Sequence, residues 1–144
     1  MKRAIELALL RDLSKKMVFV GGPRQCGKTT LAQNLMTSFK NPLYLNWDDD
    51  LQKKAILSRK WSKSHSLLVF DELHKFPRWK NWIKGIYDTQ KREHPILVTG
   101  SARLDVYRRG GDSLLGRYHY WRLHPLSLSE LPPGMSLLEG FRRL

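Results

Sequence analysis

The stretch Gly22–Thr29, GPRQCGKT, places two glycines, a lysine and a threonine at the spacing G-x-x-x-x-G-K-T. Glycine accepts backbone angles and close contacts that a side chain would prevent, so such a stretch can bend into a concave loop. Its backbone N–H groups would point inward, and the following helix would add the positive end of its dipole. Lys28 would reach the β- and γ-phosphates of a nucleotide, and the Thr29 hydroxyl would bind Mg²⁺. The pattern predicts a phosphate-binding loop rather than a structural turn that contains a lysine.

The loop is expected to touch the nucleotide along its whole length. The expected contact residues are Gly22, Pro23, Arg24, Gln25, Cys26, Gly27, Lys28, Thr29 and Thr30. Cys26 lies close in sequence to Lys28 and to the start of the predicted helix, and both features make a thiol reactive. We therefore expect an alkylating reagent to modify Cys26 readily, and bound Mg-ATP to protect it.

An acidic pair, Asp71 and Glu72, follows the apolar run LLVF. A nucleotide-bound magnesium ion needs a carboxylate at the tip of a neighbouring strand, and Asp71 is predicted to hold the ion through water. Glu72 would orient and deprotonate the attacking water. Alone, an acidic pair at a strand end is as readily a helix cap or a solvated turn. The phosphate-binding loop elsewhere in the chain favours the catalytic interpretation.

A third group of polar residues ends the run ILVTGS. Thr99 and Ser101 are candidates to sense the γ-phosphate or to hold the lytic water. If Thr99 lies within the strand, alternation places both side chains on the same side. The alternative is ordinary turn chemistry around Gly100.

The elements that must position these residues follow from the apolar pattern. Short apolar runs predict strands at Met17–Gly21, Pro42–Trp47, Ser66–Glu72, Pro95–Ser101 and Arg117–Leu123. The first, third and fourth are almost continuously apolar, as in strands buried on both faces. Between the runs lie helical patterns, and Trp79 and Trp82 belong to an amphipathic stripe expected to face the core. Strands that alternate with helices predict an α/β fold with a mostly parallel sheet.

Size, charge and cysteine content narrow the class of protein. The 144 residues suffice for one domain with its own core. A single cysteine excludes an internal disulfide and fits a cytoplasmic location, and no apolar run reaches membrane-spanning length. The net charge of +13 favours an anionic partner, such as a nucleotide, a nucleic acid, an acidic protein or a membrane surface.

Other functions remain open at this point. In KKAILSRKWSKSH, basic residues surround Trp61, which is typical of a nucleic-acid-binding module whose aromatic ring stacks on bases. Those basic residues are Lys53, Lys54, Arg59, Lys60 and Lys63. A solvated helix face, a non-hydrolysing fragment and a small-molecule kinase are further alternatives. ATP is favoured over GTP, because no Asn/Thr-Lys-x-Asp segment is present to read guanine.

Several segments together resemble a known family. They are GPRQCGKTTL, LNWDD, LLVFDELHKFPRWKNWIKGIYD, ILVTGSARLD and GDSLLGRYHYWRLHPLSLSEL, and they cover about Arg11 to Leu131. In this order they resemble the prokaryotic AAA-type ATPases of AAA domain family 14, which commonly carry a C-terminal domain of unknown function, family 4143. The resemblance implies a three-layer P-loop NTPase core of the additional-strand type, with a five-stranded sheet. The ILVTGS strand would lie between the loop strand and the Asp-Glu strand.

The resemblance also implies residue roles and an assembly. It gives Lys28, Thr29, Asp71 and Glu72 the roles described above, and a sensor near Thr99 or Ser101. Proteins of this kind often place an arginine finger just before the fifth strand. Arg117 occupies that position and would act on the γ-phosphate in a neighbouring subunit of a homo-oligomer, and Arg103 is a weaker candidate.

The end of the sequence departs from the family pattern. We expect residues 1–131 to form the ATPase core and residues 132–144 to be a short tail. The C-terminal effector region and the usual lid of the nucleotide pocket are not evident in this tail, so the hydrolytic activity of the chain alone stays open.

Overall fold

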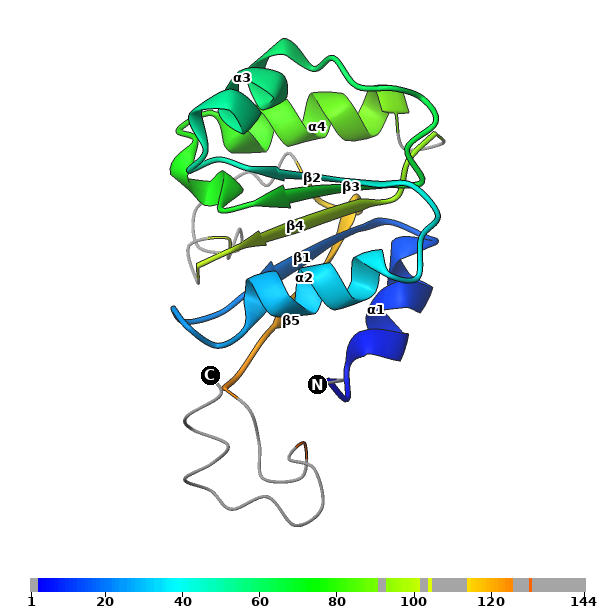
Figure 1. The fold of residues 1–144 in the computed structure, drawn as a ribbon, viewed down its shortest axis with the longest axis vertical. Helices are drawn as coiled ribbons and strands as arrows, with labels where there is room; N and C mark the ends of the chain where they lie inside the picture. The colour runs from blue at the N-terminus through cyan, green and yellow to red at the C-terminus, as the bar shows by residue number, and fades with distance from the viewer. Residues whose placement is uncertain (1–2, 91–92, 102–103, 105–113, 126–129, 131–144) are drawn as a thin grey trace.

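In a computed structural model of the chain, residues 3–90, 93–101, 104, 114–125 and 130 are described (Figure 1). Helices and strands alternate along them. In order they are α1 (Glu6–Leu13), β1 (Met17–Gly21), α2 (Lys28–Met36), β2 (Pro42–Asn46), α3 (Asp50–Ser58), β3 (Leu67–Asp71), the short 3₁₀ helix η1 (Leu73–Lys75), α4 (Trp79–Gln90), β4 (Ile96–Gly100) and β5 (Tyr118–Arg122). The predicted strands are therefore confirmed, with ends that agree to within one residue.

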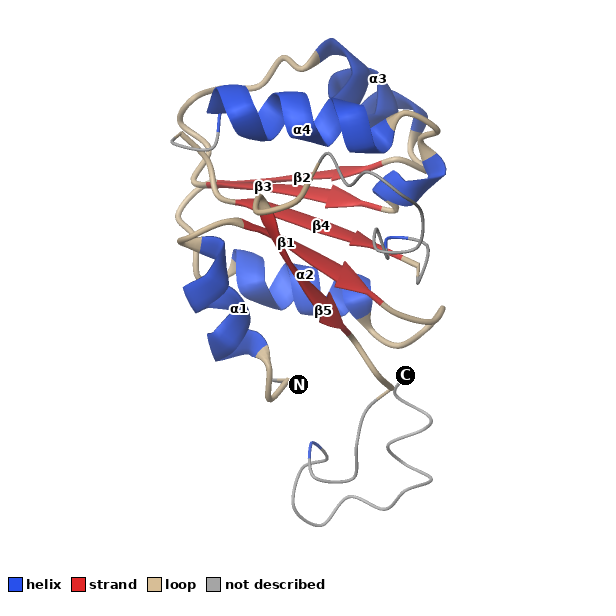
Figure 2. Ribbon diagram, turned by 180° about the vertical axis from the view of Figure 1, so that it is seen from behind, coloured by secondary structure: helices blue, strands red, loops and turns tan. Residues whose placement is uncertain are grey.

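The strands form one five-stranded sheet in the order β2-β3-β4-β1-β5, and each neighbouring pair is parallel. All five arrows accordingly point the same way in Figure 2. The predicted α/β class is confirmed. Strand β4 lies between the loop strand β1 and the Asp-Glu strand β3, as the resemblance implied.

Helices cover both faces of the sheet and make three layers. In Figure 1, α1 and α2 lie on one side of the sheet and α3 and α4 on the other. Alternate residues of β1 serve the two faces: Val18 and Val20 pack with α1 and α2, whereas Met17 and Phe19 pack with α4. Burial on both faces explains why the strands are continuous apolar runs.

The predicted apolar stripe of α4 is buried as expected. Its members Trp79, Trp82, Ile83, Ile86 and Tyr87 all belong to the core on the α3–α4 side. The tryptophans of this stripe therefore pack inside the protein.

Trp61 also serves the fold, which weighs against the alternative that it stacks on nucleic-acid bases. Its ring centroid lies 5.7 Å from that of Phe70 and 6.3 Å from that of Trp82. Its indole N–H donates to Gln90 Oε1 at 2.9 Å. The half-buried indole is thus held within the fold through both its ring and its N–H.

The amino-terminal segment forms α1, although the sequence pattern predicted no element there. Leu9 and Leu13 are buried against the sheet. Asp12 accepts a hydrogen bond from Trp121 Nε1 at 3.0 Å, which links α1 to β5. None of the helices in the described part of the chain has the length and apolar character needed to cross a membrane.

Some sequence-based expectations fall outside the described residues. They are the arginine-finger candidate Arg103, the boundary at residue 131 and the tail 132–144. These expectations stay predictions.

Because all strands are parallel, their carboxyl ends meet at one edge of the sheet, where ligands of α/β proteins bind. The loop Gly22–Gly27 leaves β1 at this edge and leads into α2. The edge is crowded, because Leu123, just after β5, donates its N–H to Gly21 O at 2.7 Å. A Cβ on Gly22 would lie 2.4 Å from Leu123 O and 2.9 Å from Cys26 Sγ.

This crowding predicts that Gly22→Ala destabilises the fold. The new methyl group would meet the backbone of the β5 segment, which cannot move as a side chain can, and we expect a loss of about 1–3 kcal/mol in the free energy of unfolding by urea. Gly85→Ala in α4 is the matched control, because its Cβ would lie 3.4 Å from the mobile Arg59 guanidinium. It should leave stability unchanged or raise it by up to about 1 kcal/mol. Equal effects of the two substitutions would contradict this account of Gly22.

Candidate functional site

The loop after β1 has the backbone geometry of an anion-binding nest. Gln25 and Gly27 have positive φ angles of 60° and 88°. When residues with positive φ stand between residues with negative φ, successive N–H groups turn toward one side of the chain. Helix α2 begins at Lys28, directly after Gly27, so its amino end faces the same space. Glycine is needed at these two positions for different reasons. Gly27 adopts a left-handed backbone conformation, whereas Gly22 packs closely against Leu123 and Cys26.

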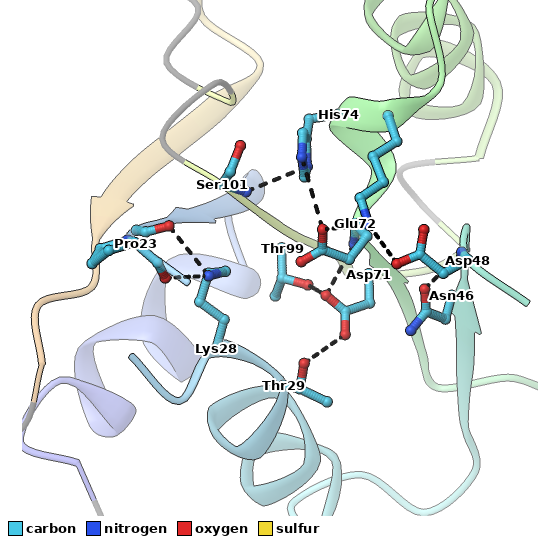
Figure 3. Close-up of polar contacts among 12 residues, drawn as sticks. Pro23, Lys28, Thr29, Asn46, Asp48, Asp71, Glu72, His74, Thr99 and Ser101 are labelled. Carbon is cyan, nitrogen blue, oxygen red and sulfur yellow. Dashed lines mark hydrogen bonds and ion pairs between the residues drawn. The ribbon is translucent and has the colours of Figure 1, made fainter. Parts of the chain in front are cut away.

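Lys28 lies folded over its own loop. Its ammonium donates to Gly22 O at 3.2 Å and to Pro23 O at 2.6 Å (Figure 3). Only 7% of the residue is exposed. The carbonyl oxygens thus occupy positions around the ammonium that phosphate oxygens of a ligand would take, because an ammonium donates without accepting.

Asp71 is the centre of the site. It is 1% exposed and ends β3 at the carboxyl edge of the sheet. Thr29 Oγ1 donates to its Oδ2 at 2.8 Å, the Thr99 hydroxyl donates to its Oδ1, and the Glu72 N–H donates to Oδ1 at 3.0 Å. A buried carboxylate is tolerated only with such donors, since their hydrogen bonds replace its lost hydration.

Tyr44 adds a further donor to Asp71 that the sequence did not reveal. Its hydroxyl donates to Asp71 Oδ2 at 2.6 Å, beside the Thr29 bond. Burial raises the pKa of Tyr44, and the hydrogen bond to Asp71 raises it further. The phenol therefore keeps its proton at neutral pH and remains a donor to the carboxylate.

Glu72 has a φ of 57°, an uncommon value for a residue with a side chain. This turn directs its carboxylate toward η1. Glu72 Oε2 lies 3.3 Å from Lys75 Nζ and 3.8 Å from His74 Nε2. Lys75 also donates to Asp48, and this hydrogen bond raises the pKa of Lys75. Glu72 is thus held at the cavity edge by a charged lysine.

The two residues predicted at the end of β4 have different surroundings. Thr99 is buried and its hydroxyl is bonded to Asp71. Ser101 follows the strand, and its N–H donates to His74 Nδ1 at 3.3 Å. Because Nδ1 accepts, the His74 proton is on Nε2, which faces Glu72. Thr99 thus contacts the Asp71 carboxylate, and Ser101 is connected through His74 to Glu72 (Figure 3).

A cavity of about 480 Å³ lies at the carboxyl edge of the sheet, and Lys28, Thr29, Asp71 and Glu72 are among its lining residues, whereas Thr99 and Ser101 are not. Most of the predicted loop and acidic residues line it: Arg24, Gln25, Gly27, Lys28, Thr29, Thr30, Asp71 and Glu72. Asn46, Asp48 and Lys75 line it as well, although sequence reasoning did not select them. The signal in the sequence was only that Asn46 is a polar residue near the end of a predicted strand, and the structure pairs it with Asp71.

Cys26 is placed differently from the expectation. It is 1% exposed and packs in the core between α1, α2 and the sheet. Its Sγ lies 3.9 Å from Lys28 Nζ, but the thiol has no access to solvent. The expected exposure of this thiol is therefore wrong, and its reactivity toward an alkylating reagent stays a prediction.

Arg117 lies at the opposite edge of the sheet. Tyr118, the next residue, pairs with Met17 at the start of β1, whereas the phosphate loop follows the end of β1. A strand of this length separates the two edges by roughly 15 Å. The Arg117 guanidinium forms an ion pair with Asp88 of α4, with Nε 2.8 Å from Oδ1. Arg117 is thus not part of the cavity in its own chain.

The chain was also compared with known proteins. Residues 14–132 match the model of a family described as AAA domain. A comparison with curated proteins found no match. Among solved structures, PCH-2 of C. elegans is similar, with 17% sequence identity and a TM-score of 0.46 over 83% of this chain. This chain spans 40% of the length of that PCH-2 chain. Since the family model covers well over half of the sequence, the chain belongs to the AAA domain family and is a P-loop NTPase core.

Proposed function

We propose that this chain binds ATP with Mg²⁺ in the cavity at the carboxyl edge of the sheet and hydrolyses the bond to the γ-phosphate. One observation carries the proposal: Thr29 at the start of α2 and Asp71 at the end of β3 meet at 2.8 Å beside the phosphate loop. A hydroxyl and a carboxylate at this distance supply the protein side of a nucleotide-bound magnesium site.

The loop would bind the phosphates by exchanging partners. Lys28 now donates to two carbonyl oxygens of its own loop. A phosphate chain in the nest would offer charged oxygens to the same ammonium, and a charge-assisted hydrogen bond is stronger than one to a neutral carbonyl. The backbone N–H groups near Gly27 and the amino end of α2 would complete the phosphate site.

The residues present fit a magnesium ion. This ion prefers oxygen ligands and retains several waters, so that one or two protein oxygens and the phosphates suffice. When bound, Mg²⁺ neutralises charge on the β- and γ-phosphates. Thr29 would contribute its hydroxyl, and Asp71 would hold the ion through water. Tyr44 and Thr99 would keep the Asp71 carboxylate in place.

Glu72 is the proposed general base. Its carboxylate lies at the cavity edge, next in sequence to the magnesium carboxylate. In that position it would accept a proton from a water that attacks the γ-phosphate. Lys75 now shares the carboxylate at 3.3 Å, so a water must compete with this ion pair. Ser101 would act near the γ-phosphate through its position after β4.

Arg117 is proposed to act on a neighbouring copy of the chain. It cannot serve its own cavity, because it lies at the other edge of the sheet. A homo-oligomer would bring it to an adjacent site, where a guanidinium stabilises charge that develops on the γ-phosphate. The client of the ATPase is not part of the proposal. We place the protein in the cytoplasm, where ATP is abundant and a single free thiol stays reduced.

Substitution of Lys28 tests nucleotide binding. Lys28→Ala removes the ammonium that would pair with the phosphates, and we expect Kd for Mg-ATP to rise at least tenfold, or about 1.4 kcal/mol. Isothermal titration calorimetry measures this change. Lys54→Ala on exposed α3 is the control and should bind as the wild type does. An unchanged Kd for Lys28→Ala would remove the phosphate-binding role of the loop.

Substitution of Glu72 separates binding from chemistry. Glu72→Gln keeps the size of the side chain but cannot accept a proton, so turnover should fall about 100-fold while Kd for ATP stays the same. Phosphate release and calorimetry report the two quantities. Glu93→Gln, at an exposed ion pair with Lys63, is the matched control and should keep full turnover. Turnover of Glu72→Gln within twofold of wild type would show that another group is the base.

Concentration dependence tests the role of Arg117. If the finger comes from a neighbour, the rate per chain should be slow when dilute and rise with protein concentration. Arg117→Ala should reduce this rise at least tenfold and leave ATP binding intact. Asp88→Ala removes the ion pair that the same arginine forms within its own chain and should keep the rise. Mixing Arg117→Ala with Glu72→Gln should restore part of the activity. A fast rate that does not depend on concentration would contradict the scheme.

A further inference from the structure

Arg3, in the segment before α1, joins three distant parts of the chain behind the phosphate loop. Its Nη1 donates to Cys26 O at 3.2 Å, and its Nη2 donates to His124 O at 2.7 Å. Its Nε pairs with Glu130 Oε1 at 2.9 Å. The amino-terminal segment, the loop and the segment after β5 are therefore tied to one guanidinium.

This contact is a built feature rather than a surface ion pair. The side chains of Arg3 and Glu130 are only 9% and 12% exposed. The Ala4 N–H also donates to Glu130 Oε1, at 3.2 Å. A planar guanidinium can hold one carboxylate and two carbonyls in a fixed geometry, which an ammonium on a flexible stem cannot do.

The bond to Cys26 O bears directly on the loop. Peptide groups are planar and trans, so the Cys26 carbonyl and the Gly27 N–H point in opposite directions. A carbonyl that faces Arg3 therefore turns the Gly27 N–H away from Arg3. Gly27 lines the cavity at the carboxyl edge of the sheet. Because Gly27 has no Cβ and a φ of 88°, little in its own structure prevents this peptide from rotating.

We propose that Arg3 is a positioning residue that orients the Cys26–Gly27 peptide so that the Gly27 N–H faces the phosphates of a bound nucleotide. This inference rests on the proposed nucleotide binding. Arg3 precedes residues 14–132, which match the family model, so the family match does not assign it. Glu130 balances the charge of Arg3, and the effect on the ligand is therefore geometric rather than a matter of net charge.

A geometric role predicts a particular pattern of losses. The peptide would hold the phosphates alike in the ground state and in the transition state. Loss of Arg3 should therefore raise Kd for ADP and for ATP by the same factor, about tenfold. It should raise KM for ATP and leave kcat unchanged, as expected when uniform binding is removed.

Three variants of the full chain separate positioning from stability. Arg3→Ala removes the guanidinium together with its ion pair to Glu130, so it should also lower stability in urea. Arg3→Ala combined with Glu130→Ala removes both members of this ion pair, which should recover part of the stability but not the affinity. Arg3→Lys keeps the charge for Glu130 without the fixed fork, so it should fold normally and lose most of the affinity. Arg11→Ala, at an exposed arginine on α1, is the control for both measurements.

Calorimetric titration of each variant with Mg-ADP and Mg-ATP decides the matter. The expected result is weaker binding in every Arg3 variant, including the stable double variant, and wild-type binding by Arg11→Ala. If the stable Arg3 variants bind both nucleotides with a Kd within twofold of wild type, the proposed role of Arg3 is overturned and the proposed nucleotide binding is not. Normal binding by Arg3→Lys with loss in Arg3→Ala would also overturn it, because charge would then suffice. A wild-type chain that binds neither nucleotide would instead overturn the proposed function.

Discussion

A carboxylate buried at the end of β3 constrains the whole carboxyl edge of the sheet. Asp71 is nearly inaccessible to water, so its charge must be met by donors from the protein. Those donors come from α2, from β2 and from β4, through Thr29, Tyr44 and Thr99. The elements around β3 are thus held in place by hydrogen bonds to one charged group. A shift of any of them would leave a buried oxygen without a partner, at a cost larger than that of a lost surface contact.

The same edge combines tight packing with backbone freedom. At Gly22 the loop passes so close to the segment after β5 that a methyl group does not fit, whereas at Gly27 the chain turns through a left-handed conformation. The start of the loop is therefore held by its neighbours, and its end relies on contacts such as that with Arg3. A loop that is rigid at one end and adjustable at the other can present N–H groups accurately and still admit a ligand.

Much of this structure could be predicted from the sequence, because its signals are local. Strands buried on both faces are continuous apolar runs, and the phosphate loop and the acidic pair are short motifs at strand ends. Periodicity does not reveal which strands are neighbours, and the family resemblance implied only that β4 lies between β1 and β3. The places of β2 and β5 in the sheet were not predicted. Tyr44, Trp61, Cys26 and Arg3 were missed or misplaced because their surroundings are tertiary. Arg3 and Glu130, for instance, are 127 positions apart and meet only in the folded chain.

The position of β4 between β1 and β3 has a consequence for how the chain folds. Strand β1 pairs only with β4 and β5 among the described strands, and β3 pairs with β2 and β4. During synthesis from the amino terminus, β2 and β3 can pair early, but β1 must wait with its apolar residues unpaired until β4 emerges. Such non-local pairing slows folding and prolongs the exposure of unpaired, aggregation-prone strand edges. The loop on β1 and the carboxylate on β3 therefore come together late, and a nucleotide that needs both could stabilise only the nearly finished protein.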